Sequence, residues 1–206
     1  MEKSRTKSER KMSQTKYERD SEDFSKLLSK LIKEETKNAV EIMNTIKDEP
    51  STSTDSRCRL IVLACHALLK DEMLESEYTQ LIAQQVIWFI NNEPEHPVLA
   101  SPFAHGPLIE SIPSVREAWL QLTEATNSAI VLAHASNYFY FENTPTSLEL
   151  LHRALATGTN ETKVWSFAEM IHCVMTESPN TNSDEVTDWL SKIKILLDKR
   201  RSTETP

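Results

Sequence analysis

The chain has two glycines among its 206 residues, and this scarcity restricts the folds open to it. Tight hairpin turns and phosphate-cradling loops need positive backbone φ angles, which glycine adopts at little cost. The sequence therefore argues against a β-rich fold and against a glycine-rich nucleotide loop. It predicts helices joined by connectors of serine, threonine, asparagine and proline.

Cysteine and long apolar runs are also scarce. The three cysteines, Cys58, Cys65 and Cys173, are too few for a disulfide framework, so we expect a reducing compartment, the cytoplasm or the nucleus, either of the protein's own cell or of a host cell that a virus has entered. No run approaches the roughly 18–20 apolar residues of a membrane span, and the N-terminus lacks the apolar segment of a secretory signal. We therefore expect an intracellular protein without a membrane partner.

Charge is distributed unevenly along the chain, whose net charge is −8. Seven basic and three acidic side chains give residues 1–19 a charge of +4, which leaves −12 on residues 20–206. We expect residues 1–19 to form a disordered basic tail, because no apolar period is present there. The basic residues are Lys3, Arg5, Lys7, Arg10, Lys11, Lys16 and Arg19.

Such a tail is either a solvated leader or a contact for nucleic acid. Its cations would give salt-dependent affinity for RNA without sequence preference. Phosphorylation of Ser4, Ser8 or Ser13 would cancel part of that positive charge and weaken the contact. The acidic remainder of the chain is unsuited to bind nucleic acid generally.

Apolar spacing predicts a single all-α, bundle-like domain of about seven helices over residues 20–201. Residues 20–47 are expected to form one long amphipathic helix, whose one-sided apolar stripe would pack across the domain or pair two copies through residues 21–47. We expect residues 55–91 to form a central helical hairpin. Its first helix is apolar on every side near 60–65, which is typical of a buried helix. Residues 202–206 are expected to be a disordered end.

Residues 92–113 hold five of the nine prolines and are expected to form a long loop. We regard this loop either as a partner-binding element or as a packed crossover. Its candidate partner contacts are His96, Pro97, Phe103, His105 and Pro107.

The remaining helices are expected within residues 114–201, where local end signals are clear. Ser114 and Glu117 have the spacing of a capping box and predict a helix that begins at Ser114. Pro145 fits the first turn of a later helix, and Gly158 fits the residue just after its end.

No motif for catalysis, metal binding or a cofactor stands out. The pairs Cys65–His66 and His172–Cys173 lack the spacing of zinc ligands, because adjacent helical residues point about 100° apart. Neither a nucleophile motif nor a phosphate loop is present. We therefore expect no catalytic, cofactor-binding or metal residues, and we expect a non-catalytic protein–protein interaction module, an adaptor or assembly factor.

A set of landmarks in the centre of the chain carries a family resemblance. Asp55, Ser56, Arg59 and Cys65 head the buried helix, Pro97–Leu99 follow in the loop, and Ser114 opens the next helix. Over residues 24–157 the chain resembles the helical domain of the filovirus minor nucleoprotein, a family related to the pneumovirus transcription antitermination factor.

The resemblance implies an alternative function, that of a viral nucleocapsid-associated transcription cofactor. Such a protein would bind nucleoprotein through its helices and RNA through the basic, phosphorylatable tail. The chain departs from the family in two ways. Residues 1–57 hold neither cysteine nor histidine in place of the family's Cys3His zinc motif, and two predicted helices follow where the family's domain ends. No zinc is therefore carried over.

Overall fold

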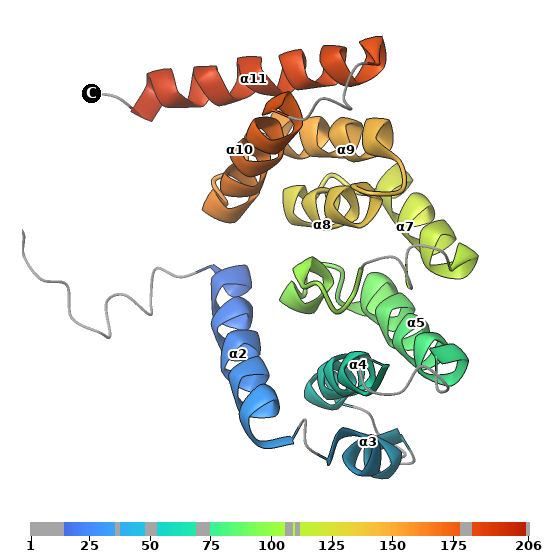
Figure 1. Ribbon diagram of the computed structural model, residues 1–206. Coiled ribbons are helices and arrows are strands. Elements are labelled where there is room, and N and C mark those ends of the chain that lie inside the picture. The colour runs from blue at the N-terminus through green and yellow to red at the C-terminus, as the bar shows by residue number, and fades with distance from the viewer. Residues whose placement is uncertain are drawn as a thin grey trace, which may run out of the picture. The chain divides into compact units, whose positions relative to one another are not determined.

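The computed structural model describes residues 15–35, 38–47, 53–68, 75–105, 109, 112–177 and 183–204. Every regular element in these ranges is helical, so the all-α prediction is confirmed (Figure 1). None of the described helices has the length and hydropathy needed to cross a bilayer.

The chain separates into two compact units, which differs from the single bundle expected. Unit 1 comprises residues 1–89 and 96–104, and unit 2 comprises residues 90–95 and 105–206. Apolar periodicity shows which face of a helix is buried but not which helix covers it. The sequence pattern therefore did not reveal that the helices serve two cores.

Unit 1 is formed by helices from the first half of the chain. The elements are α2 (Lys16–Lys30), the π-helical turn η1 (Leu31–Glu35), α3 (Ala39–Lys47), α4 (Thr54–Leu68), α5 (Glu75–Asn92) and the 3₁₀ helix η4 (Pro97–Ala100). The last turn of α5, from Ile90 onward, belongs to unit 2.

Helix α2 begins at Lys16, four residues before the expected start. The Thr15 hydroxyl accepts the Glu18 N–H at 3.2 Å, and the Glu18 carboxylate accepts the Thr15 N–H at 2.9 Å. This capping box satisfies backbone donors that a helix otherwise leaves unpaired. Residues 15–19 are therefore ordered and not part of a tail, while residues 1–14 lie outside the described residues.

The long helix expected over residues 20–47 is divided. Helix α2 ends at Lys30, five residues continue as a π-helical turn, and α3 starts separately at Ala39. The buried face of α2 consists of Tyr17, Ser21 and Phe24, and the Phe24 ring meets the His96 ring edge-on at 6.0 Å. Unit 1 itself thus buries part of the stripe that suggested pairing of two copies, whereas Ile32 is 48% exposed, and pairing stays a prediction.

Helix α4 is buried on all sides, as its composition predicts. Residues 60–64 are at most 1% exposed. At its polar end, Arg57 donates to Gln85 Oε1 at 2.7 Å and lies 4.2 Å over the Trp88 ring. Because both partners belong to α5, Arg57 ties the two helices together.

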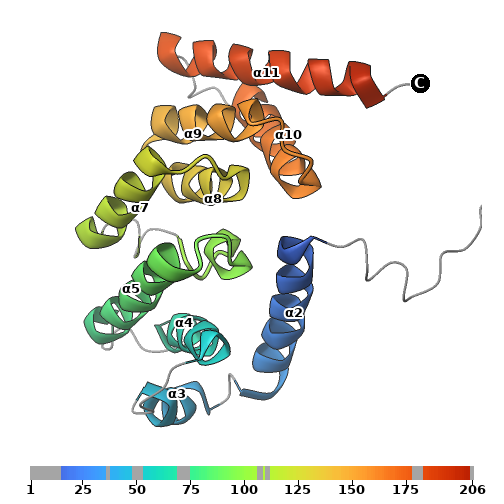
Figure 2. The same ribbon diagram turned by 180° about the vertical axis from the view of Figure 1, so that it is seen from behind.

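Unit 2 is formed by the helices of the second half of the chain (Figure 2). They are α7 (Pro113–Ala125), α8 (Ala129–Phe139), α9 (Thr144–Ala156), α10 (Thr162–Glu177) and α11 (Asp184–Glu204). Helices α8 and α9 lie side by side in both views, and α11 packs on α9 and α10.

The start of α7 corrects the capping box expected at Ser114. The N-cap is Ile112, whose carbonyl accepts the Arg116 N–H at 3.2 Å, and no side chain caps this end. Pro113 occupies the first helical position, where its missing N–H costs nothing and its fixed φ favours a helix. The helix therefore starts before Ser114, which is exposed in the first turn.

A break at residues 126–128 separates α7 from α8, although the apolar spacing that follows Ser114 continues through it and predicts a single helix. The Ser128 hydroxyl accepts the Val131 N–H at 3.4 Å and caps α8, and Thr126 Oγ1 accepts the Ser128 N–H at 3.1 Å. Short hydroxyl side chains that bond to nearby backbone compete with a continuous helix.

Small polar residues bring α8 and α9 into close contact. Ser136 and Ser147 are fully buried, with their hydroxyl oxygens 3.1 Å apart. Ser147 also donates to the Ser136 carbonyl oxygen at 2.8 Å. Hydroxyls paired in this way avoid the cost of a buried, unsatisfied polar group.

The end of α9 agrees with the sequence prediction. Pro145 lies in its first turn, and Gly158 follows the C-cap Thr157 with φ of +71°. The Gly158 N–H donates to the Leu155 carbonyl at 3.1 Å and closes the helix. At the other end of the unit, α11 continues through Glu204, so residues 202–204 are helical and only 205–206 lie outside the described residues.

We predict that Gly158→Ala lowers the free energy of unfolding by about 1 kcal/mol, because a side chain disfavours this left-handed backbone conformation. A Cβ atom at this position has nothing within 4 Å, so the loss comes from the backbone alone. Gly158→Asn is the matched control and loses less, since asparagine tolerates the conformation better. Urea unfolding checks this order, and equal stability of all three proteins would contradict it.

Candidate binding groove

A groove of about 620 Å³ lies in unit 2, where the end of α9, the start of α10 and the last turns of α11 meet. This volume is in the range of small-ligand and peptide side-chain sites. Its apolar lining consists of Leu155, Ala156, Gly158, Trp165 and Leu196. Its polar lining consists of Thr159, Asn160, Thr162, Lys199, Arg200 and Thr203.

The turn between α9 and α10 is held by hydrogen bonds that also fix one wall of the groove. The Trp165 indole N–H donates to the Thr159 carbonyl at 2.8 Å. Thr159 Oγ1 accepts the Glu161 N–H at 3.1 Å, just before α10 begins. These bonds fix the position of the Trp165 ring. The indole N–H of Trp165 is already paired within the turn, so the ring contributes its apolar surface to the groove.

Arg200 crosses from α11 to the same ring. Its guanidinium carbon lies 4.6 Å from the centre of the Trp165 ring, a cation–π arrangement. Lys199, the next cation of the lining, is exposed. The Arg200 guanidinium is therefore held against the Trp165 ring, whereas the Lys199 ammonium lies on an exposed side chain that can change rotamer.

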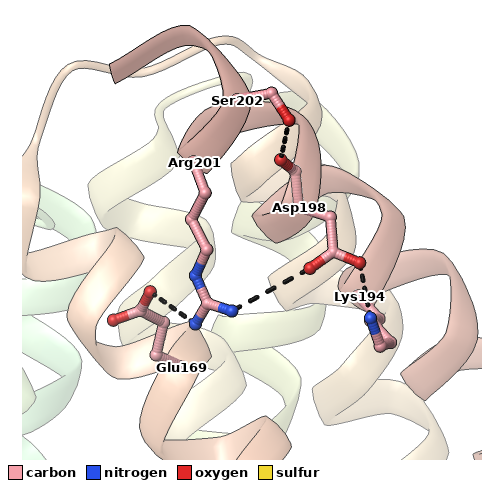
Figure 3. A network of polar contacts seen from close by, with 5 residues as sticks. All are labelled: Glu169, Lys194, Asp198, Arg201 and Ser202. Atoms are coloured by element: carbon pink, nitrogen blue, oxygen red, sulfur yellow. Dashed lines mark hydrogen bonds and ion pairs between the residues drawn. The ribbon is translucent and has the colours of Figure 1, made fainter. Parts of the chain in front are cut away.

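Helix α11 is fixed to α9 and α10 by an apolar stripe with polar pairs beside it. The stripe consists of the buried residues Val186, Leu190, Ile193 and Leu197, which recur at helical spacing. Beside it, Arg201 contacts Glu169 of α10 at 3.1 Å and Asp198 of its own helix at 3.9 Å, as Figure 3 shows. Asp198 also pairs with Lys194, and its backbone carbonyl accepts the Ser202 hydroxyl at 2.9 Å.

The exposed ion pairs contribute little stability compared with the stripe, since pairs of this kind are typically worth about 0–1 kcal/mol. The Lys194 ammonium holds the pKa of the Asp198 carboxyl below its usual value. Asp198 therefore stays ionised through the mildly acidic range. Apolar burial positions α11, and the Arg201–Glu169 pair adds one exposed polar contact to α10.

Two histidines lie under α11. The His152 ring is 5.5 Å from the Trp189 ring, and burial, together with the nearby Lys192 ammonium, lowers the pKa of His152. Burial and the Lys194 ammonium likewise lower the pKa of His172, against the opposing effect of Asp198. Both imidazoles thus favour the neutral form when α11 is in place.

Most of the basic residues expected in a tail lie outside the described residues, namely Lys3, Arg5, Lys7, Arg10 and Lys11, together with Ser4, Ser8 and Ser13. Lys16 and Arg19 are described, and both are exposed on the first turns of α2. Glu18 and Asp20 alternate with them, so the start of α2 is not a one-signed basic surface.

Three residues of the expected partner loop pack within unit 1. His96 Nδ1 accepts the Val98 N–H at 3.2 Å and caps η4, and the His96 ring lies 4.8 Å from the Phe89 ring. Pro97 begins η4 and is buried. The Phe103 carbonyl accepts the Cys65 thiol at 3.4 Å.

His105 belongs to unit 2, where its Nε2 accepts the Asn137 side-chain N–H at 2.8 Å. Pro107 lies outside the described residues. The described loop residues therefore make the contacts of a packed crossover, and the sequence had left this alternative open beside partner binding.

The first cysteine and histidine pair, Cys65–His66, packs inside unit 1, whereas Cys173 of the second pair is exposed. Burial raises the pKa of the Cys65 thiol to about 12, and His66 packs beside the Phe103 ring with centroids 6.1 Å apart. The nearby Glu177 carboxylate raises the pKa of the Cys173 thiol. Within the described part of the chain, no three potential ligands are close enough to hold a metal ion.

The groove residues were not identified from the sequence. Lys199 and Arg200 lie near the C-terminal end of their helix, where positive charge is favoured in any case. Trp165 carried no signal beyond its helical position. Only the packing of α9, α10 and α11 brings these residues together.

Comparisons with protein-family models, with curated proteins and with solved structures found no match to this chain. The landmark residues of the filovirus resemblance are divided between the units. Asp55, Ser56, Arg59 and Cys65 lie on α4, and Pro97–Leu99 lie in η4, both in unit 1, whereas Ser114 lies in unit 2. The resemblance stays a prediction.

We predict that the free energy of unfolding falls as the pH is lowered from about 7 to about 5. His152 and His172 have lowered pKa values when folded, so the unfolded chain binds more protons in this window and acid favours it. Their contribution is present above the unfolded pKa of about 6.5 and is lost below it.

The double variant His152→Gln, His172→Gln should show a shallower slope over the same interval, measured by urea unfolding at several pH values. His66→Gln is the control, because that ring lies in unit 1. An unchanged slope in the double variant would show that the two rings do not govern the acid response.

Proposed function

We propose that this chain is a non-catalytic helical interaction module that binds a partner protein through the groove of unit 2. The observation that carries the proposal is the groove itself, which combines an apolar floor with two cations and several hydroxyls. Mixed linings of this kind give a ligand apolar contact area and fix its orientation.

The surroundings of the nucleophilic and basic side chains support binding over catalysis. The Cys65 thiol, with its pKa of about 12, is not a thiolate at neutral pH. His134 is 3% exposed, and its Nδ1 lies 3.1 Å from the Pro94 carbonyl oxygen, which it contacts as a donor. His96 caps a helix and His105 accepts from Asn137. These groups have structural partners instead of the nucleophile–base geometry that catalysis needs.

We predict that Ala156→Trp abolishes partner binding without lowering stability. Ala156 is exposed and lines the groove, so a large ring at this position fills the groove from its rim and leaves the core untouched. Ser191→Trp is the matched control, because Ser191 is exposed on α11 and does not line the groove.

Quantitative affinity enrichment with the two variants and the original chain measures this effect. A protein retained by the original chain and by Ser191→Trp, but lost with Ala156→Trp, is the expected result. If every retained protein binds Ala156→Trp equally well, the groove is not the binding site.

The alternative function, an RNA-binding transcription cofactor, rests on the basic residues of 1–14. The described residues add Lys16 and Arg19 at the surface of α2. A truncation at Asp20 would be a poor test, since it removes the Thr15–Glu18 capping box and the buried Tyr17 as well. Substitution of the tail avoids this confusion.

We predict that changing Lys3, Arg5, Lys7, Arg10 and Lys11 to glutamine removes RNA binding if the tail makes it. Each lost phosphate contact lowers the salt slope of the binding constant by about 0.7. Fluorescence anisotropy with a labelled single-stranded RNA at several salt concentrations measures the slope. Equal slopes for the original and substituted chains would exclude the tail as the contact.

A further inference from the structure

The electrostatic character of the groove differs from that of the chain as a whole. The chain has 31 acidic and 23 basic residues, yet none of the described residues that line the groove is aspartate or glutamate, and two are cations. In a predominantly acidic protein this is the composition expected where a negative ligand has to be attracted.

Helix termini at the groove add smaller effects of opposite sign. Thr162 is the first residue of α10, so the positive end of that helix dipole faces the groove. The end of α9 opposes it, but its Leu155 carbonyl already accepts the N–H groups of Thr157 and Gly158. The side-chain cations therefore dominate the sign of the local potential.

We propose that the groove binds a short acidic peptide segment of a partner protein. Its carboxylates lie beside Lys199 and Arg200, and one of its apolar side chains covers Ala156 and Leu196. This inference rests on the proposed function and deepens it by naming the chemistry of the ligand.

The apolar floor favours a peptide over an isolated phosphate group. A phosphate would engage the cations but would leave the exposed Ala156 and the half-buried Leu196 uncovered in a groove of about 620 Å³. The Arg200 guanidinium is stacked on Trp165, and a planar guanidinium suits a planar carboxylate. A segment with alternating acidic and apolar residues matches both parts of the lining.

Stabilisation of the end of α11 does not by itself explain the two cations. Arg201 also lies in this last part of the helix, and it pairs with Glu169 and Asp198 beside α10 (Figure 3). Lys199 and Arg200 instead line the groove, and neither of those carboxylates is among its described lining residues. A favourable interaction with the helix dipole requires cations near the C-terminal end of α11, but it does not require them to lie on the side of the helix that lines the groove.

The test uses the full-length ¹⁵N-labelled chain and an acetylated, amidated hexapeptide of sequence Asp-Leu-Glu-Asp-Leu-Glu. We expect saturable amide shifts in the turn at residues 157–161 and in the last turns of α11. The neutral peptide Asn-Leu-Gln-Asn-Leu-Gln should bind at least about fivefold more weakly, because charge-assisted contacts are lost.

Lys199→Gln should weaken the acidic peptide about fivefold, and Lys30→Gln, which removes the same charge from α2 in unit 1, should leave binding unchanged. Raising the salt concentration from about 50 mM to about 500 mM should also weaken binding of the acidic peptide to the original chain. Both lysines are exposed, so neither variant is expected to unfold.

The proposal is overturned if the neutral peptide binds equally well, if the shifts lie outside the groove, or if no saturable binding occurs. Displacement of the peptide by equimolar inorganic phosphate would also overturn it and would assign a phosphate site instead. Loss of a partner with Ala156→Trp but no acidic-peptide binding would leave the proposed function standing and refute only this inference.

Discussion

The docking of α11 onto α9 and α10 is the interaction on which the candidate site depends. Four buried aliphatic residues, Val186, Leu190, Ile193 and Leu197, form the contact stripe. Burial of each side chain contributes on the order of 1.5–3 kcal/mol relative to exposure, which exceeds what the flanking ion pairs supply. Without this contact Lys199, Arg200 and Trp165 would not share a surface. The groove is thus a product of tertiary packing.

The same contact explains the local chemistry of unit 2. Two histidines are kept near the neutral form because α11 covers them and places lysines beside them. Arg200 stacks on Trp165 because the helix is rotated to bring that side chain inward. Acid stability and ligand binding should therefore respond to one structural element. Protonation of His152 and His172 would then weaken the docking of α11, and with it the groove, although neither histidine lines the groove.

Much of the secondary structure could be predicted from the sequence, for identifiable reasons. Glycine scarcity and apolar periodicity predicted helices, and the all-apolar run at 60–64 predicted a buried helix. Gly158 marked a helix end because only a positive φ closes that turn cheaply. The errors arose where several signals competed. Pro113 displaced the cap expected at Ser114, and Thr126 and Ser128 broke a helix whose apolar pattern continues through them.

The site could not be predicted, because its residues are separated in the chain and lack a motif. Leu155, Trp165 and Lys199 come from three helices, and each has an ordinary explanation on its own helix. Loop residues such as His96 and Phe103 attracted attention through composition, whereas their contacts are internal to unit 1. Sequence patterns report local preferences and burial. They do not report which surfaces remain open once the helices have packed.

The most direct test of this account is native-state amide hydrogen exchange of the full chain. If α11 is docked by its apolar stripe, amides between Leu190 and Leu197 should exchange with an opening free energy equal to that of the α9 core. Ile193→Ala should then lower protection in both helices together. Rapid exchange of α11 while α9 stays protected would show that α11 is not held in place, and the groove would lose its structural basis.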